Sequence, residues 1–269
     1  PGMAEALDIP IIPLKVHWND KTYLDGITLD AVTFYRWLQE REELPVTSQP
    51  SAGEFLDFFK NVAERFNTDA ILGVFISSDM SGTVASAELA KQELPALQIE
   101  IVDSRSVSMG LGFSAIVAAR MAKEDASLSE ISERLYQLRE EMQIIFTVDT
   151  LEYLHRGGRI GGAARLLGTV LNLKPLLAVE NGQVEAIQKV RSRRKSLQQI
   201  IDEAQQRLNG HRPAELAVVQ AEAEKDAERL TNWVNEQLRP RRLYHSILSP
   251  VVGTHGGPGT VGIAFYPEH

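Results

Sequence analysis

Hydrophobic and polar positions alternate along the first half of the chain in a strand–helix pattern. Apolar runs of buried-strand length occupy residues 11–16, 71–76 and 97–103, and helical patterns follow the last two. Residues 52–66 form an amphipathic helical pattern. Its apolar face carries Phe55, Phe58, Phe59, Val62 and Phe66. Strand–helix–strand repetition with short connections predicts a parallel sheet covered by helices.

The pattern changes after about residue 140. A strand is predicted at 144–150, and "LLAVENGQVEAI" (176–187) predicts a hairpin, because Asn181-Gly182 favours a tight two-residue turn. Hairpins mixed with helices predict an α+β part with a mixed or antiparallel sheet. We therefore expect an α/β protein of two closely packed domains, residues 1–142 and residues 143–269. The later strands are expected at 215–222, 242–248 and 260–266.

Composition narrows the class of protein. The 269 residues carry a net charge of −8, which argues against nucleic acid as the main partner, because a nucleic-acid binder needs a basic face. No stretch approaches the ~18 apolar residues of a membrane span, and the first residues lack a signal-peptide pattern. We therefore expect a cytoplasmic protein without membrane insertion. The absence of cysteine, and six histidines without paired spacing, argue against a metal site.

Four polar, glycine-bearing loops interrupt the apolar pattern, and we expect the functional site among them. In open α/β sheets, loops that follow the carboxyl ends of parallel strands bind ligands. The four loops are residues 44–55, 77–83, 154–162 and 253–260.

The loop "SSDMSGT" (77–83) places hydroxyl groups where a buried strand meets a helix. Ser81, Gly82 and Thr83 should lie at the helix N-terminus, where free backbone N–H groups and the helix dipole attract an anion. Ordinary helix capping by serine or threonine is the alternative explanation. The loop is not a phosphate-binding Walker loop, because the required spacing and lysine are missing.

The loop at 44–55 contains a capping box, in which Ser51 precedes a helix and Glu54 follows three residues later. This motif explains Ser51 without any function. It leaves Thr47 unexplained, so Thr47 is a candidate ligand-binding residue.

The last two loops contribute cations and an imidazole. Arg156 and Arg159 surround the glycines of "RGGRIGG", and arginine beside such a turn suits a carboxylate or a phosphate. His255 lies among glycines without periodic apolar neighbours, so a buried structural role explains it poorly.

A basic segment, "KVRSRRKS" (189–196), stands out in an acidic chain. It is interpreted either as a solvated helix start or as a docking patch for an acidic protein partner. Its patch residues would be Arg191, Arg193, Arg194 and Lys195.

Taken together and in order, these motifs resemble the DegV family, bacterial fatty-acid-binding proteins that serve as the lipid-carrying subunit of fatty acid kinase. The resemblance extends over nearly the whole chain. The matching segments are "TSQPSAGEF", "SSDMSGT", "VDSRSVSMGLG" (102–112), "DTLEYLHRGGRI" (149–160) and "GTHGGPGTVGIAF" (253–265).

The resemblance implies two domains with one long-chain fatty acid in a tunnel between them, and no other cofactor. Hydroxyl groups of Thr47 and Ser81 would hold the carboxylate, with Arg159 and His255 nearby and Arg156 close enough to compete. A separate kinase would phosphorylate the carboxylate, so the chain itself would have no turnover. Family members usually begin with a short strand ending in an Asp-Ser turn, and we expect this first strand to be absent here.

A hydrolase is the alternative from another functional class. Ser81 would be the nucleophile and His255 the base of an esterase or acyl-phosphate hydrolase. The sequence offers no identifiable acidic partner for the histidine, and Ser81 lacks the nucleophile-elbow pattern.

Overall fold

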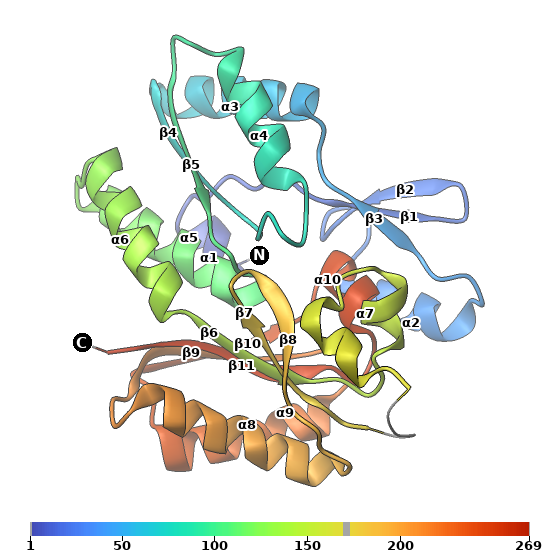
Figure 1. Cartoon of the computed structure of the whole chain (residues 1–269). Coiled ribbons are helices and arrows are strands. Elements are labelled where there is room, and N and C mark those ends of the chain that lie inside the picture. Colours follow the sequence, from blue (N-terminus) through green and yellow to red (C-terminus); the bar gives the residue numbers. More distant parts are fainter. Residues whose placement is uncertain (1, 169–172, 269) are drawn as a thin grey trace.

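The computed structural model describes residues 2–168 and 173–268, which fold into a mixed α/β structure with three sheets (Figure 1). A parallel pair of strands and a three-stranded antiparallel sheet lie in the N-terminal half, and a six-stranded mixed sheet lies in the C-terminal half. The predicted fold class is confirmed. The domain boundary at residues 142 and 143 stays a prediction.

The parallel pair consists of β4 (Ala70–Phe75) and β5 (Gln98–Asp103), as the apolar runs predicted. Its two faces bury alternate side chains, since neighbouring residues of a strand point in opposite directions. Phe55 and Phe59 pack against one face, and Leu135 and Leu138 belong to the core on the other. The helices that cover the pair are α3 (Ala52–Phe66), α4 (Thr83–Gln92), α5 (Ser108–Lys123) and α6 (Leu128–Glu141).

Helix α3 has the predicted bounds and begins with the predicted capping box of Ser51 and Glu54. Phe66 departs from the expected buried face. It is the last residue of α3 and is 41% exposed, and its ring lies 5.0 Å from the guanidinium carbon of Arg65.

The three-stranded sheet, ordered β2-β1-β3, partly contradicts the sequence prediction. The expected strand at 11–16 begins only at Lys15, because Pro10 and Pro13 lack the N–H group that a strand ladder needs. The chain then turns back through Asn19 and Asp20, both with positive φ. The strands are β1 (Lys15–Trp18), β2 (Lys21–Leu24) and β3 (Val46–Ser48).

The six-stranded sheet has the order β10-β9-β11-β6-β7-β8. Strands β9 and β10 are parallel and the other neighbours are antiparallel, so the sheet is mixed as predicted. The hairpin at Asn181-Gly182 is confirmed, with φ values of 50° and 83°. The strands are β6 (Gln143–Thr147), β7 (Leu176–Glu180), β8 (Gln183–Gln188), β9 (Pro213–Gln220), β10 (Arg242–Ile247) and β11 (Val261–Pro267).

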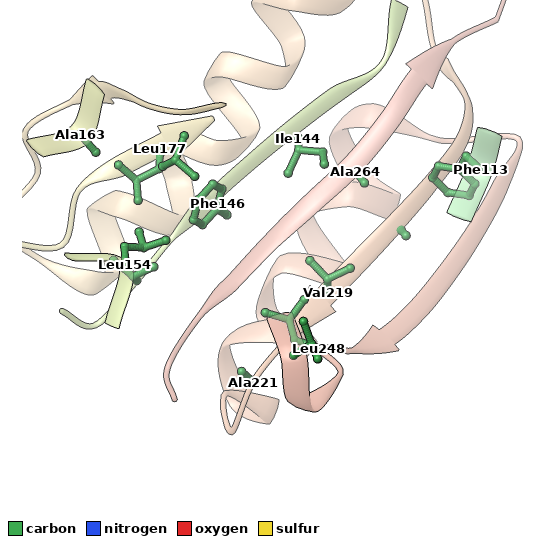
Figure 2. Close-up of a cluster of buried hydrophobic side chains, with 14 of the residues drawn as sticks. Phe113, Ile144, Phe146, Leu154, Ala163, Leu177, Val219, Ala221, Leu248 and Ala264 are labelled. Atoms are coloured by element: carbon green, nitrogen blue, oxygen red, sulfur yellow. The ribbon is translucent and has the colours of Figure 1, made fainter. Parts of the chain in front are cut away.

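The two faces of this sheet enter different cores. Helices α8 (Arg193–Leu208) and α9 (Glu224–Trp233), followed by a π-helical turn (Val234–Leu238), cover one face (Figure 1). The other face looks toward the N-terminal half. Figure 2 shows Ile144 and Phe146 of β6 and Val219 of β9 along it.

The remaining elements are short, and two of them carry the predicted site residues Arg156 and His255. No helix in the described ranges is long and apolar enough to cross a membrane. These elements are α1 (Gly2–Ala6), α2 (Ala31–Glu40), α7 (Glu152–Arg156), a 3₁₀ helix (Gly161–Leu166) and α10 (Pro250–Gly256).

Candidate functional site

A cavity lies between the inner face of the six-stranded sheet and loops of the N-terminal half. It encloses about 920 Å³ of empty space, part of which is open to solvent. Most of its wall is apolar, as expected of a pocket that takes a small organic ligand. The apolar lining residues are Leu14, Ile76, Met80, Val107, Ile144, Phe146, Leu154, Val179, Val184, Val219, Leu248, Val251 and Val252.

Four of the predicted site residues meet at this cavity. Thr47, Ser81, Arg159 and His255 all line it, although they come from four segments far apart in the sequence. The sequence analysis missed the polar side chains that accompany them. Of these, Ser48 and Gln49 sit within the "TSQPS" motif, which was a usable signal. The missed polar residues are Ser48, Gln49, Ser108 and Thr260.

Thr47 and His255 are in direct contact. Oγ1 of Thr47, on β3, lies 2.8 Å from Nε2 of His255, on α10. The N-terminus of α10 is fixed by Asp25, whose carboxylate accepts hydrogen bonds from the Ser249 hydroxyl (2.8 Å) and the Val251 N–H (3.3 Å). The imidazole is therefore placed by the packing of α10 against the N-terminal half.

Burial keeps His255 neutral. Desolvation and, secondly, the charge of Arg159 lower the pKa of His255 from 6.5 to about 4. Its Nδ1 is buried and has no hydrogen-bond partner in the described part of the chain. Gly157 lies so close that a Cβ there would be 2.1 Å from Nδ1.

The loop with Ser81 ends at a helix N-terminus, as predicted. Helix α4 begins at Thr83, and its N-cap is Gly82, which makes no side-chain capping bond. Capping by serine or threonine therefore does not account for the hydroxyl groups. The Oγ of Ser81 lies 2.8 Å from Oγ1 of Thr83, and only Ser81 of this pair lines the cavity. Gly82 packs against the amide of Gln49.

These contacts give the hydrolase hypothesis no support. The hydroxyl of Ser81 bonds to Thr83, whereas His255 bonds to Thr47. A catalytic histidine is normally oriented by a carboxylate on its second nitrogen. Here that nitrogen, Nδ1, has no partner among the described residues.

The two arginines of "RGGRIGG" have different positions. Arg159 lines the cavity and donates from Nε to the carbonyl of Met80 (2.9 Å). Arg156 does not line it. Its side chain is 61% exposed and forms an ion pair with Glu152 on the same helix, at 2.5 Å.

The basic segment is only partly exposed. Arg191, Arg194 and Lys195 are exposed, but Arg193 is turned inward. The guanidinium of Arg193 donates to Asp226 (2.7 Å) and to the carbonyl of Gly259 (2.6 Å). The expectation that Arg193 belongs to a surface patch is thus wrong, because it holds the turn that follows His255.

The described residues, 2–168 and 173–268, contain no candidate metal-binding site. Within these ranges, no group of three histidine, cysteine, aspartate or glutamate side chains could hold a metal ion.

Comparison with known proteins gives consistent matches over the whole length. The family model of the DegV family, described as uncharacterised proteins, matches residues 1–268. A DegV domain-containing protein of Deinococcus radiodurans is 35% identical over an alignment of 270 positions, which covers 99% of this chain and 94% of that protein.

Solved structures share the fold. A fatty-acid-binding DegV family protein from Thermus thermophilus is 32% identical, with a TM-score of 0.93 over 99% of this chain and 95% of that one. DegV from Bacillus subtilis, described as a fatty acid binding protein, is 30% identical, with a TM-score of 0.90 over 99% and 94%. The whole-chain family match and these relatives show that the chain belongs to the DegV family.

Proposed function

We propose that this protein binds one long-chain fatty acid in the cavity and presents its carboxylate to a separate kinase, which forms the acyl phosphate. The observation that carries the proposal is an apolar cavity in which Thr47, Ser81, Arg159 and His255 gather as polar groups. Its solved relatives from Thermus thermophilus and Bacillus subtilis are described as fatty-acid-binding proteins. The protein acts as a carrier, and the chemistry belongs to the kinase.

The apolar wall supplies most of the affinity in this proposal. Burying a chain of roughly 14 methylene groups contributes on the order of 10 kcal/mol, at ~0.8 kcal/mol for each, before the costs of association. The polar groups then have to fix the orientation of the ligand rather than provide its binding energy.

The carboxylate would bind where Ser81 meets the N-terminus of α4. The Ser81 hydroxyl can donate to a carboxylate oxygen, and the helix dipole favours negative charge there. Among the described residues that line the cavity, Arg159 carries the one permanent charge. Because His255 stays neutral, a single cation faces the carboxylate, which limits its stabilisation and leaves it reactive toward the kinase.

A kinase has to reach the protein from the cytoplasm, where we place this carrier. Arg191, Arg194 and Lys195 are exposed at the start of α8 and suit docking of an acidic surface. We also propose that residues 1–142 and 143–269 form two domains with the fatty acid between them.

Mass spectrometry tests the proposal most directly. The purified protein is weighed under native and denaturing conditions, and any released lipid is identified. One fatty acid per chain supports the carrier function. A protein that stays empty after incubation with a panel of fatty acids contradicts it.

Matched variants test the carboxylate site. Ser81→Ala and Thr47→Val each remove one hydroxyl, and a lost hydrogen bond of about 1 kcal/mol should weaken fatty acid binding about fivefold. Ser78→Ala is the control, since its hydroxyl lies in the same loop but donates to Asp103 (2.6 Å) outside the cavity. If Ser81→Ala and Thr47→Val both keep full affinity and full activity as kinase substrates, the assigned site is wrong.

A further inference from the structure

Gln49 lies at the mouth of the apolar cavity. It lines the cavity and is also exposed, so it lies where the enclosed space meets the solvent. The backbone on either side of it is held in place. Ser48 ends β3 and pairs with Lys15 of β1, and the buried Pro50 leads into the capping box that starts α3. The position of Gln49 is therefore set by both neighbouring elements.

The amide of Gln49 lies beside the N-terminus of α4. A Cβ added to Gly82, the N-cap of this helix, would lie 2.9 Å from Nε2 and 3.2 Å from Cδ of Gln49. The φ of Gly82 is −71°, which any residue can adopt, so the backbone conformation does not require glycine here. The missing side chain of Gly82 instead leaves the space that the Gln49 amide occupies.

This amide has no partner within the described part of the protein. Neither its NH₂ group nor its carbonyl oxygen forms a hydrogen bond with a described residue. Ser81, which precedes Gly82, lines the same cavity, and the N-cap of α4 makes no side-chain capping bond. A glutamine amide offers two N–H donors, and a helix N-terminus favours negative charge. A free, uncharged donor therefore lies near the hydroxyl that we assign to the carboxylate.

We propose that the Gln49 amide binds the fatty acid carboxylate directly and donates to the oxygen that faces solvent. The inference rests on the proposed fatty-acid binding. Since a separate kinase reaches the ligand from the solvent side, Gln49 holds the oxygen that accepts the phosphoryl group. An amide suits this position because it orients the oxygen without adding a second positive charge beside that of Arg159.

The test compares two ligands that share a chain and differ in head group. Tetradecanoic acid and tetradecan-1-ol are titrated by calorimetry into the delipidated wild type, Gln49→Ala and Gln49→Glu. Gln49→Ala should weaken binding of the acid about tenfold, since a hydrogen bond to a charged group is lost. Gln49→Glu places a second carboxylate beside the first and should weaken the acid at least about a hundredfold. Both variants should bind the uncharged alcohol within about fivefold of the wild type.

Gly82→Ala reaches the same amide by a second route. The three heavy atoms nearest to its added Cβ all belong to the Gln49 side chain, so the methyl group should displace the amide and weaken binding of the acid. In a Gln49→Ala background the amide is gone, and Gly82→Ala should cause little further loss. Gln92→Glu, at the exposed last residue of α4, is the control for added charge and should change neither ligand.

Three results would overturn the inference and leave fatty-acid binding intact. The first is an unchanged affinity for the acid in both Gln49 variants. The second is an equal loss of acid and alcohol in Gln49→Glu, since the residue would then shape the mouth without contacting the carboxylate. The third is full additivity in the double variant, because the amide would then not act at the start of α4. A wild type that binds no fatty acid would instead overturn the proposed function, and this inference with it.

Discussion

Oγ1 of Thr47 and Nε2 of His255 lie 2.8 Å apart, although 208 positions separate the two residues in the sequence. The contact joins the three-stranded sheet to the short helix that precedes β11. Both side chains line the cavity. The geometry of the site therefore depends on how the two halves of the chain pack.

Replacing Arg159 should weaken fatty acid binding, whereas replacing Arg156 should leave it nearly unchanged. Arg159→Met removes the cation that lines the cavity and should weaken fatty acid binding about tenfold or more, because a charge-assisted hydrogen bond is lost. Arg156→Met removes an exposed side chain paired only with Glu152, and affinity should change less than twofold. Titration calorimetry of both variants checks this. Equal losses would mean that Arg159 acts through general electrostatics and not through contact.

The neutral state of His255 should make stability depend on pH. The pKa is about 4 in the folded protein and 6.5 ordinarily, so the unfolded chain binds the proton first as pH falls. The free energy of unfolding should therefore decrease between about pH 6.5 and pH 4, by at most about 3 kcal/mol from this residue.

Urea denaturation at pH 7 and pH 4.5 measures this effect. His255→Gln should reduce the pH-dependent loss of stability, whereas His245→Gln, an exposed site on β10, serves as the control. An NMR titration that gave His255 a pKa of 6 or above would disprove the assignment.

Gly157→Ala should disturb the site without straining the backbone. Gly157 has an ordinary helical conformation (φ −73°, ψ −7°), but an added Cβ would lie 2.1 Å from Nδ1 of His255. We expect a loss of about 1–3 kcal/mol in stability, together with weaker fatty acid binding as the imidazole is displaced.

Gly53→Ala provides the comparison for a helical glycine. Its added Cβ would meet only the Ser51 hydroxyl, at 4.0 Å, so the variant should be about 0.5–1 kcal/mol more stable. Thermal unfolding and the NMR signals of the His255 ring distinguish the two variants. An unchanged His255 ring in Gly157→Ala would show that the site can absorb the extra methyl group.

The tip of the β7–β8 hairpin should be sensitive to side-chain size. Its Gly182 accepts a hydrogen bond from the buried Ser77 hydroxyl (2.7 Å), and a Cβ there would lie 2.6 Å from that oxygen. Gly182→Ala should therefore destabilise the protein for two reasons. Alanine disfavours the positive φ of this position, and its Cβ would overlap the Ser77 hydroxyl oxygen. Gly210 has a similar φ of +90° with no atom within 4 Å of an added Cβ.

Gly210→Ala should thus lose about 1–2 kcal/mol from backbone strain alone. Gly182→Ala should lose a further 1–3 kcal/mol, roughly, because of the overlap. Urea denaturation gives the difference between the two variants. If they are equally stable, the hairpin tip does not pack firmly on the Ser77 loop.

The sequence was most informative about local structure. Asn181-Gly182 predicted its hairpin correctly because the turn depends on the conformational freedom of two residues. The start of α4 after Gly82 was also foreseeable, since a strand run gives way there to a helical pattern. The strand predicted to begin at residue 11 begins only at Lys15, because Pro10 and Pro13 lack the N–H groups that a strand needs for pairing.

The site could be predicted only in part, because its members meet through long-range packing. Periodicity places Arg156 and Arg159 on one short segment but does not tell which of them reaches the cavity. Arg193 was predicted to lie on the surface, because its partner Asp226 is 33 positions away and no local pattern reveals the pairing. The contribution of Gln49 depends on how β3 lies beside the Ser81 loop, and no local pattern reports that.

The place of β11 in its sheet has a consequence during protein synthesis. This strand lies between β9 and β6, although Val261–Pro267 is the last strand that the structure describes. Until these residues have left the ribosome, β9 and β6 have no central partner and their apolar faces stay exposed. The parallel pair near the N-terminus can form earlier, so the nascent chain should expose the aggregation-prone strands β9 and β6 until β11 has emerged.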